Sequence, residues 1–370
     1  MSQKADLRAA RPANSVTCSG SSPAAGFAHV TTDRAAHGRM TGVRRSTGRM
    51  TRITPLPAEF GARPFRVAEA LASGVTPSRL RAGDLLTPTR GVRVARSVTF
   101  ATSARSAHHQ DRLRADLLER AAAVAPALTP DQFFSHGTAL ALLGAPLPYL
   151  RATAWELHVS ARRPAGQPRR AGVVGHRLQA RAPARGTAHG LPIEHPARAW
   201  RQAAQTWDLD DVIAAADHLV CPRHRIITPA DLRAEIADAG DLRGGLLTRA
   251  LAEVRVGAET AEETHVRLLL MRAGLPEPSL NHRVQDSLGR FIARLDLAYP
   301  GYRVAVEHDG RTHAFDEQQF AKDADRWDAI RDEGWLLVRI LSHHLRPDPR
   351  RALAKVTDAL IARGWRPGVD

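Results

Sequence analysis

Hydrophobic and polar positions alternate most regularly in the last third of the chain. Residues 260–274 place Val266, Leu269 and Leu270 on one face of a helix that Gly274 is expected to end. The segments after it are expected to form, in order, three strands, a helix, a strand and a helix: 275–286, 291–299, 303–310, 316–333, 335–341 and 349–363. This order of elements predicts an α/β sandwich.

Near the other end of the chain, residues 64–95 have the outline of a winged helix-turn-helix. A first helix ends at Gly74, and Thr76 is placed to cap a second helix, with Pro77 in its first turn. The sequence LLTPTRGVRV then predicts two short strands around a turn, which is the wing.

Four arginines in this segment are candidates for DNA contact. Arg79 and Arg81 are expected on the second helix, and Arg90 and Arg93 on the wing. In the functional interpretation they bind phosphates first and base edges second. In the alternative interpretation the segment is a small interaction module whose arginines are solvated.

The middle of the chain has a mixed pattern. Helices are expected around SHGTALALLG and over 108–127, 196–220 and 229–254, the last interrupted near Gly244-Gly245, and strands at WELHVSA and GVVGHRL. Ser135 and His136 are adjacent, but the start of a capped helix explains Ser135 better than a nucleophile does. This region is therefore expected to be a mixed α+β scaffold without catalytic residues.

These patterns divide the chain into four parts. They are an N-terminal extension over 1–55, a winged helix-turn-helix over 56–100, a mixed α+β domain over 101–256 and an α/β domain over 257–370. The extension lacks periodicity and is interpreted as disordered, or as sequence upstream of a true start at Met50. A basic arm that binds nucleic acid is the alternative.

Composition narrows the class of protein. The net charge is +15, and almost all of the positive charge is arginine, which fits either a high-GC coding bias or a nucleic-acid partner, DNA before RNA. No apolar run of about 18 residues exists, so no membrane span is expected. Cys18 and Cys221 have no metal-binding spacing, and a cytoplasmic protein is expected.

The candidate chemistry lies in YPGYRVAVEHDGRTH. Asp296 precedes a short turn and Glu307 follows it, so antiparallel pairing is expected to place the two carboxylates side by side. Two such acids repel unless a cation or a proton lies between them, and oxygen ligands favour Mg²⁺ or Mn²⁺. Asp309 is a further metal-ligand candidate.

Two more residues complete the predicted catalytic set. Glu263, on the preceding helix, is expected to supply a third carboxylate, and His313 to transfer a proton or contact the scissile phosphate. Other interpretations are open for each position. Glu263 fits a capping box, Asp296 fits an ion pair with Arg294 or Arg303, Asp309 fits a turn, and His313 fits an ordinary surface position.

On these residues a resemblance can be stated. GLPEPSLNHRV, RLDLAYPGYRVAVEHDGRTH, the D-x-x-R of Asp323 and Arg326, and GWLLVRI resemble the actinobacterial family known as domain of unknown function 559. That family is similar to the very-short-patch repair endonucleases and, more distantly, to the PD-(D/E)XK nucleases. The resemblance covers about residues 259–345. The region from residue 64 through the middle domain is similar, more loosely, to AbiEi-type antitoxins.

The resemblance implies a restriction-endonuclease-like αβα sandwich at the C-terminus. Asp296 and Glu307 then correspond to the acids of the superfamily, and Glu263 to its helix acid. The superfamily lysine, two residues after the second acid, is Asp309 here, and very-short-patch enzymes use histidine instead, which points to His313.

The sequence therefore leaves two functions open. The first is a Mg²⁺-dependent DNA endonuclease that a winged helix positions on DNA. The second is a DNA-binding regulator, or an antitoxin-like protein with a toxin partner, whose nuclease fold has lost catalysis. The target and a homodimeric state are left open.

Overall fold

The computed structural model describes residues 53–98, 109–148, 156–178, 181, 185–309 and 317–368. His313 and almost all of the predicted N-terminal extension lie outside these residues, as do the side chains of Asp309 and Asp323. The described chain is a mixed α/β protein with three sheets. None of the described helices is both long enough and apolar enough to cross a membrane.

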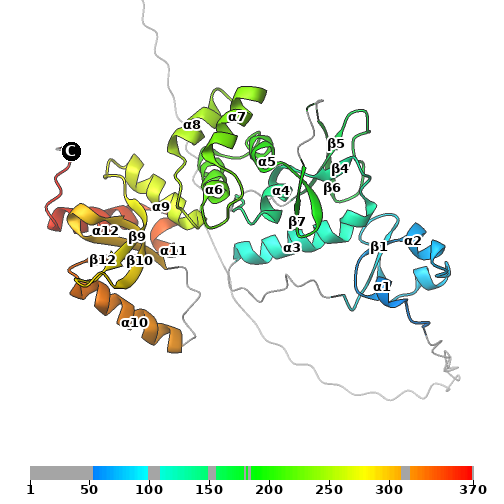
Figure 1. Cartoon of the computed structure of the whole chain (residues 1–370), viewed down its shortest axis with the longest axis horizontal. Coiled ribbons are helices and arrows are strands. Elements are labelled where there is room, and N and C mark those ends of the chain that lie inside the picture. The colour runs from blue at the N-terminus through cyan, green and yellow to red at the C-terminus, as the bar shows by residue number, and fades with distance from the viewer. Residues whose placement is uncertain are drawn as a thin grey trace, which may run out of the picture. The chain divides into compact units, whose positions relative to one another are not determined.

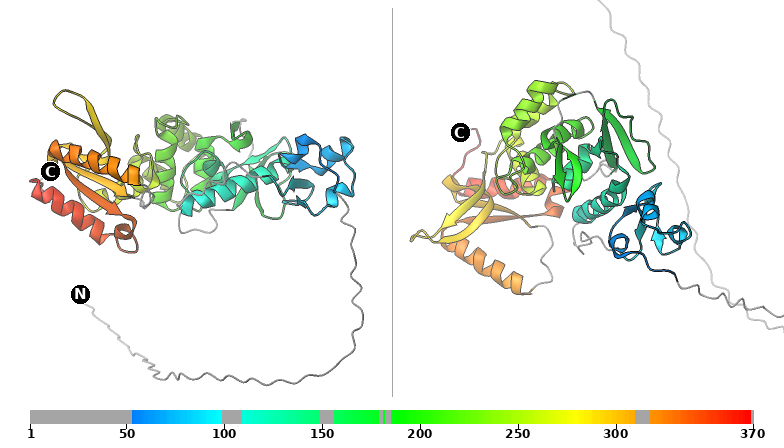
Figure 2. Two further views of the ribbon diagram at one scale, coloured as in Figure 1. Left: turned by 90° about the horizontal axis from the view of Figure 1, so that it is seen from below. Right: turned by 45° about the vertical axis from the view of Figure 1, so that its right-hand side comes forward.

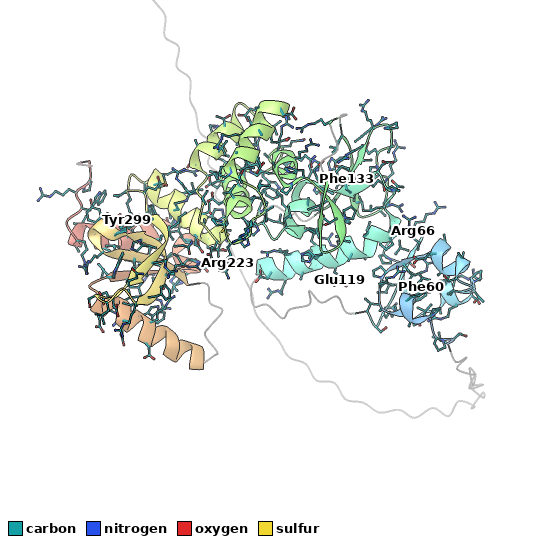
Figure 3. All side chains as sticks on the ribbon, viewed as in Figure 1. Phe60, Arg66, Glu119, Phe133, Arg223 and Tyr299 are labelled. Carbon is teal, nitrogen blue, oxygen red and sulfur yellow. The ribbon has the colours of Figure 1, made fainter. Side chains whose placement is uncertain are left out.

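The first sheet belongs to a small module near residue 60 (Figure 3 labels Phe60). Its elements are α1 (Ala58–Gly61), β1 (Phe65–Arg66), α2 (Val67–Ala72), η1 (Arg79–Arg81), β2 (Leu85–Leu86) and β3 (Val92–Ala95). The strands lie in the antiparallel order β1-β3-β2 around buried Phe60, Phe65 and Leu80.

The sequence predicted this module in part. Gly74 adopts a φ of 83° and ends the first helix, as expected, with the N–H of Val75 bonded to the carbonyl of Ala70. The wing strands β2 and β3 pair as expected. The second helix is shorter than expected, because only one 3₁₀ turn, η1, forms after Thr76.

The second sheet has five strands in the order β6-β5-β4-β8-β7. Figure 1 labels β4, β5, β6 and β7 of this sheet. They are β4 (Gln132–Phe134), β5 (Leu157–Arg162), β6 (Val173–Leu178), β7 (Arg185–Ala188) and β8 (Leu191–Glu194). The helices of this region are α3 (His109–Val124), η2 (Ala125–Ala127), α4 (His136–Leu142), α5 (Pro196–Ala203), α6 (Leu209–Val220), α7 (Pro229–Ala239) and α8 (Leu246–Glu253). Most of them share one large apolar cluster with the sheet.

Two segments predicted as helical are each divided. The segment 196–220 breaks before Asp208, which precedes α6 with an extended backbone. The segment 229–254 breaks at Gly240 and again before α8, where Gly245 has a left-handed φ of 83°. The predicted interruption near Gly244-Gly245 is confirmed. The breaks before Asp208 and at Gly240 were not predicted, because helical periodicity continues across them.

The third sheet has the order β12-β11-β10-β9. The elements are α9 (Ala261–Arg272), β9 (Ser279–Gln285), β10 (Phe291–Tyr299), η4 (Pro300–Tyr302), β11 (Val304–Asp309), α10 (Glu317–Asp332), β12 (Leu336–Leu341), α11 (Ser342–Leu345) and α12 (Arg350–Ala362). The predicted order of helices and strands is confirmed, with α11 added. β11 and β12 are parallel, and the other pairs are antiparallel.

Helices cover both faces of this sheet. Figure 2 shows α10 on one side and α12 on the other. One apolar cluster joins Val266 of α9 and Val356 of α12 to the sheet, and a second cluster joins Ile330 of α10 to it. The restriction-endonuclease-like assignment of this sandwich stays a prediction, as does the division of the chain into domains.

A buried ion pair connects α6 with α9. The Asp217 carboxylate accepts hydrogen bonds from the Arg267 guanidinium and the Thr264 hydroxyl, each at 2.9 Å, and from the Arg255 N–H at 2.7 Å. The Asp217 and Arg267 side chains are 1% and 0% exposed. This pair therefore fixes α9, which carries Glu263, to the helical middle region.

Candidate active site

Strands β10 and β11 bring Asp296 and Glu307 together. The antiparallel register pairs Leu297 with Val306, so the next opposed pair is Asp296 and Glu307. Opposed side chains on one face have Cβ atoms about 4.5–5.5 Å apart. Glu307 lies two residues from Ala305, which belongs to the apolar cluster under α10, so both carboxylates face α10.

Arg326 of α10 is the counter-charge for this pair. Its Nη2 donates to both carboxylate oxygens of Glu307 at 2.9 Å. Burial raises the pKa of Glu307, and the Asp296 charge raises it further, while the Arg326 guanidinium opposes both effects. Burial likewise raises the pKa of Asp296, against Arg326 and a hydrogen bond from the His308 backbone. The arginine thus keeps two close acids partly compensated.

Glu263 lies at the first turn of α9 and has a structural role. Its N–H donates to the Thr260 hydroxyl oxygen at 3.2 Å, and its carboxylate accepts from the Thr260 hydroxyl at 3.0 Å and from the Glu259 N–H at 2.9 Å. The side chain is nevertheless buried, with 5% of the residue exposed. Glu263 therefore caps α9 while its side chain is buried and does not point into solvent.

The charge of Asp296 acts on both of the other acids. Burial raises the pKa of Glu263 to about 7, and the charges of Asp296 and Glu259 add to that rise. Asp296 also raises the pKa of Glu307. A carboxyl with a pKa near neutrality can accept or donate a proton at physiological pH.

The three acids do not form a closed ligand set. Among the described residues, no three acids bring their oxygens within 4.8 Å of one another. The Asp309 side chain and His313 lie outside the described residues. Asp296, Glu307 and Glu263 are thus the members of the predicted site whose side chains the structure describes.

The ion pairs considered for Asp296 are not the ones that form. The Arg294 guanidinium donates two hydrogen bonds, at 2.7 and 2.9 Å, to Glu259. Arg303 bonds to the carbonyl of Glu333. Both arginines are thus used elsewhere, and α10 supplies the strongest positive charge near Asp296.

A cavity of about 580 Å³ is lined by residues of α9, β11, α11 and α12. Its walls include His265 of α9, His308 of β11, and Arg346 and Leu353 near α12. Because His308 follows Glu307 along the strand, its side chain faces the opposite side of the sheet. The candidate acids do not line this cavity.

The four arginines of the N-terminal module divide into two kinds. Arg79 is only 9% exposed, and its guanidinium donates to both carboxylate oxygens of Asp84 at 2.8 and 2.7 Å. Arg93 is half-buried and bonds to the carbonyls of Leu80 and Val92. Both side chains therefore stabilise the module.

Arg81 and Arg90 are the exposed members of the set. A guanidinium on the surface can reach a phosphate without losing an internal hydrogen bond. The prediction of DNA contact therefore rests on Arg81 and Arg90 more than on the other two.

Sequence reasoning missed two features. It quoted Arg326 as part of a motif without predicting the ion pair with Glu307, for which the i, i+19 separation gives no local signal. It also treated the middle region as scaffold, yet His136, His158 and His176 form a cluster there. Their separation in sequence hides that cluster until strand register is known.

Comparison with known proteins gives a distant relationship. The chain is 28% identical over 184 residues to "Uncharacterized protein Rv2248" of Mycobacterium tuberculosis (strain ATCC 25618 / H37Rv). It has the same identity over the same length to "Uncharacterized protein MT2308" of strain CDC 1551 / Oshkosh. The chain is a distant relative of these two mycobacterial proteins. The alignment covers 50% of this chain and 64% of each relative, which is less than two thirds of their length.

The other two comparisons gave no match. No family model matches the chain, and no solved structure matches it. The resemblance to the family of unknown function 559 therefore remains a hypothesis that rests on the quoted motifs.

Proposed function

We propose that the chain is a Mg²⁺-dependent DNA endonuclease whose active site is built on β10, β11 and α9. The observation that carries the proposal is the opposed pair Asp296 and Glu307, with a third buried acid, Glu263, close enough to be perturbed by Asp296. Buried acids whose pKa is raised by a neighbouring acid are typical of sites that bind a cation or transfer a proton.

The donor chemistry fits a hard divalent ion. Asp296 and Glu307 would hold it through carboxylate oxygens, with Asp309 and Glu263 as further candidates, and Mg²⁺ or Mn²⁺ prefers such ligands. When bound, such an ion lowers the pKa of a water molecule and stabilises negative charge on a phosphodiester.

The residues of the chain supply the remaining functions. Glu263, with a pKa of about 7, is suited to take a proton from the attacking water. Arg326 has to give up part of its pairing with Glu307 when a cation binds, and its guanidinium is then free to contact a phosphate oxygen. His313 remains the predicted residue for protonating the leaving oxygen.

The N-terminal module is proposed to hold the DNA. Arg81 and Arg90 are exposed near the wing, where phosphate contacts give affinity without sequence preference. The net charge of +15 favours the same partner.

A second function is favoured by a specific observation. Arg326 already neutralises Glu307, and Asp309 stands at the lysine position that the family resemblance implies. A nuclease-like fold in which arginine replaces the ion would bind DNA as a regulator or as an antitoxin-like protein and would not cut it.

Cleavage of supercoiled plasmid separates the two functions. The nuclease proposal predicts nicking by the full chain with Mg²⁺ or Mn²⁺, none with chelator, and at least about a 100-fold loss in Asp296→Asn. Asp358→Asn, an exposed acid on α12, is the matched control and is expected to keep activity. Gel-shift binding of the plasmid without metal-dependent nicking would support the regulator, and nicking that survives Asp296→Asn would remove the assigned site.

A further inference from the structure

Strand register collects polar side chains on one face of the five-stranded sheet. Phe133 of β4 pairs with Ser160 of β5, and Ser160 pairs with His176 of β6. Side chains two residues apart in a strand share a face, so His158 joins Ser160 and His176. Ser135, two residues after Phe133, follows onto the same face (β4, β5 and β6 in Figure 1).

A third histidine reaches this group from α4. His136 is the first residue of that helix, and its ring centroid lies 3.9 Å from the ring of His176 and 5.2 Å from that of His158. His158 Nδ1 and His176 Nε2 are 2.9 Å apart. One nitrogen from each of the three rings lies within 4.8 Å of the other two.

Burial disfavours the protonated form of two of these rings, His136 and His176. Burial, together with the two neighbouring histidines, holds the pKa of His136 at about 2. Burial also lowers the pKa of His176. Neutral imidazole is the form that binds metal ions, since a protonated ring has no free lone pair.

The hydroxyl groups of Ser135 and Ser160 form a hydrogen-bonded chain that begins at Nδ1 of the His136 ring. His136 Nδ1 lies 3.0 Å from the Ser135 hydroxyl, which in turn accepts a 2.7 Å hydrogen bond from the Ser160 hydroxyl. When Nδ1 carries the proton and donates to Ser135, Nε2 is left for a ligand. Metal-binding histidines ordinarily donate their second N–H to an oxygen in this way.

The backbone of His136 is held in an uncommon conformation. Its φ is 51°, in the left-handed region, which is unfavourable for a residue other than glycine. The His136 N–H donates to Gln202 Oε1 at 3.1 Å, and the Gln202 amide donates to the buried Glu194 at 3.1 Å. These hydrogen bonds from α5 hold the backbone of His136, and its ring stacks on those of His158 and His176, with 20° and 22° between the ring planes.

Gly175 allows the loop before β6 to pack directly against that strand. A Cβ there would lie 1.9 Å from the carbonyl oxygen of Pro168, so the preceding loop packs directly on the backbone of β6. The neighbouring residue, His176, projects to the opposite face, toward His136 and His158. The loop and Gly175 therefore position the edge strand that carries the third ring.

We propose that His136, His158 and His176 bind one transition-metal ion of the Zn²⁺ class, with a water or small ligand at the fourth position. His158 Nδ1 and His176 Nε2 share a hydrogen bond at 2.9 Å, and the three rings are stacked, so metal binding has to displace the shared proton and turn the rings until their lone pairs converge. Two imidazole nitrogens at Zn–N distances of about 2.0–2.1 Å in a tetrahedral site lie about 3.4 Å apart, so this pair also has to open by about 0.5 Å. Three imidazoles favour zinc-like ions over Mg²⁺, so this site is chemically distinct from the carboxylate site of the proposed nuclease.

The test is a metal titration of the full chain, without a histidine tag and after chelator treatment. The wild type is expected to bind one Zn²⁺ or Co²⁺ per chain, with Co²⁺ giving the visible absorption of a four-coordinate site. Loss of one ligand in His176→Gln is expected to weaken binding by about 100-fold or more. His176 is half-buried on the edge strand, so this substitution is chosen to preserve the fold.

His189→Asn is the matched control, because His189 is exposed and asparagine tolerates its left-handed φ of 50°. It is expected to bind like the wild type. His158→Gln replaces His176→Gln if circular dichroism shows the latter to be unfolded. Absence of stoichiometric Zn²⁺ binding by the wild type, or unchanged binding by a folded ligand variant, would overturn the proposal.

Discussion

Replacing Glu263 with glutamine tests whether a buried, proton-binding carboxyl lies beside Asp296. Glutamine has nearly the same shape, and it keeps one acceptor for the Glu259 N–H, while its amide can donate to the Thr260 hydroxyl oxygen. The substitution therefore removes the titration of this position and leaves most of its contacts in place.

The magnitude follows from the raised pKa of Glu263. The pKa rises from an ordinary 4.5 to about 7, so the folded state binds this proton more tightly than the unfolded state. The stability that this proton contributes is complete below pH 4.5 and is lost as the pH rises through 7. At about 1.36 kcal/mol per pH unit, the wild type should lose about 2.5 kcal/mol relative to Glu263→Gln between pH 5 and pH 8.

Urea unfolding of both proteins at a series of pH values measures this difference. Glu262→Gln, a half-exposed neighbour on the same turn, controls for loss of charge on α9. A wild type that loses no stability relative to Glu263→Gln across this range would refute the reasoning that Glu263 is buried beside a second acid.

Three further predictions concern other charges. Asp217→Ala should destabilise the chain by about 3–5 kcal/mol in urea unfolding, because it leaves the Arg267 charge buried and unpaired; an effect below 1 kcal/mol would contradict this. Arg326→Gln should lower the melting temperature without metal, because Glu307 and Asp296 lose their counter-charge, and Mg²⁺ should raise it more than in the wild type; equal Mg²⁺ shifts would argue against an ion between the acids. Arg81→Ala should weaken DNA binding and reduce the salt dependence of log K by about one phosphate contact. Arg79→Ala should mainly lower stability, because it removes the ion pair with Asp84. Equal losses of DNA binding in the two variants would contradict the assignment of DNA contact to Arg81 and of a structural role to Arg79.

The elements of the C-terminal region could be predicted because local signals agreed there. Gly274 follows α9, a short connection joins β10 to β11, and the apolar run of β12 is bounded by polar segments. The pairing of Asp296 with Glu307 also follows from a local connection, since a short turn leaves few possible registers.

Contacts that depend on distant segments could not be predicted. The Arg326–Glu307 pair requires the position of α10 on the sheet, and the three-histidine cluster requires the parallel register of β5 and β6 across a loop. The role of Glu263 was hard to predict for a different reason: the same side chain caps α9 and is affected by the charge of Asp296. A capping motif in sequence is therefore compatible with a chemical role.

The central claim is that Asp296 and Glu307 bind one divalent ion, and Mn²⁺ binding followed by electron paramagnetic resonance measures that most directly. The titration is made with the full chain and with Glu307→Gln, after the zinc-class site has been saturated with Zn²⁺. The account predicts one Mn²⁺ per chain in the wild type, displaced by Mg²⁺, and loss of that ion in Glu307→Gln. Equal Mn²⁺ binding by both proteins, or none by the wild type, would contradict it.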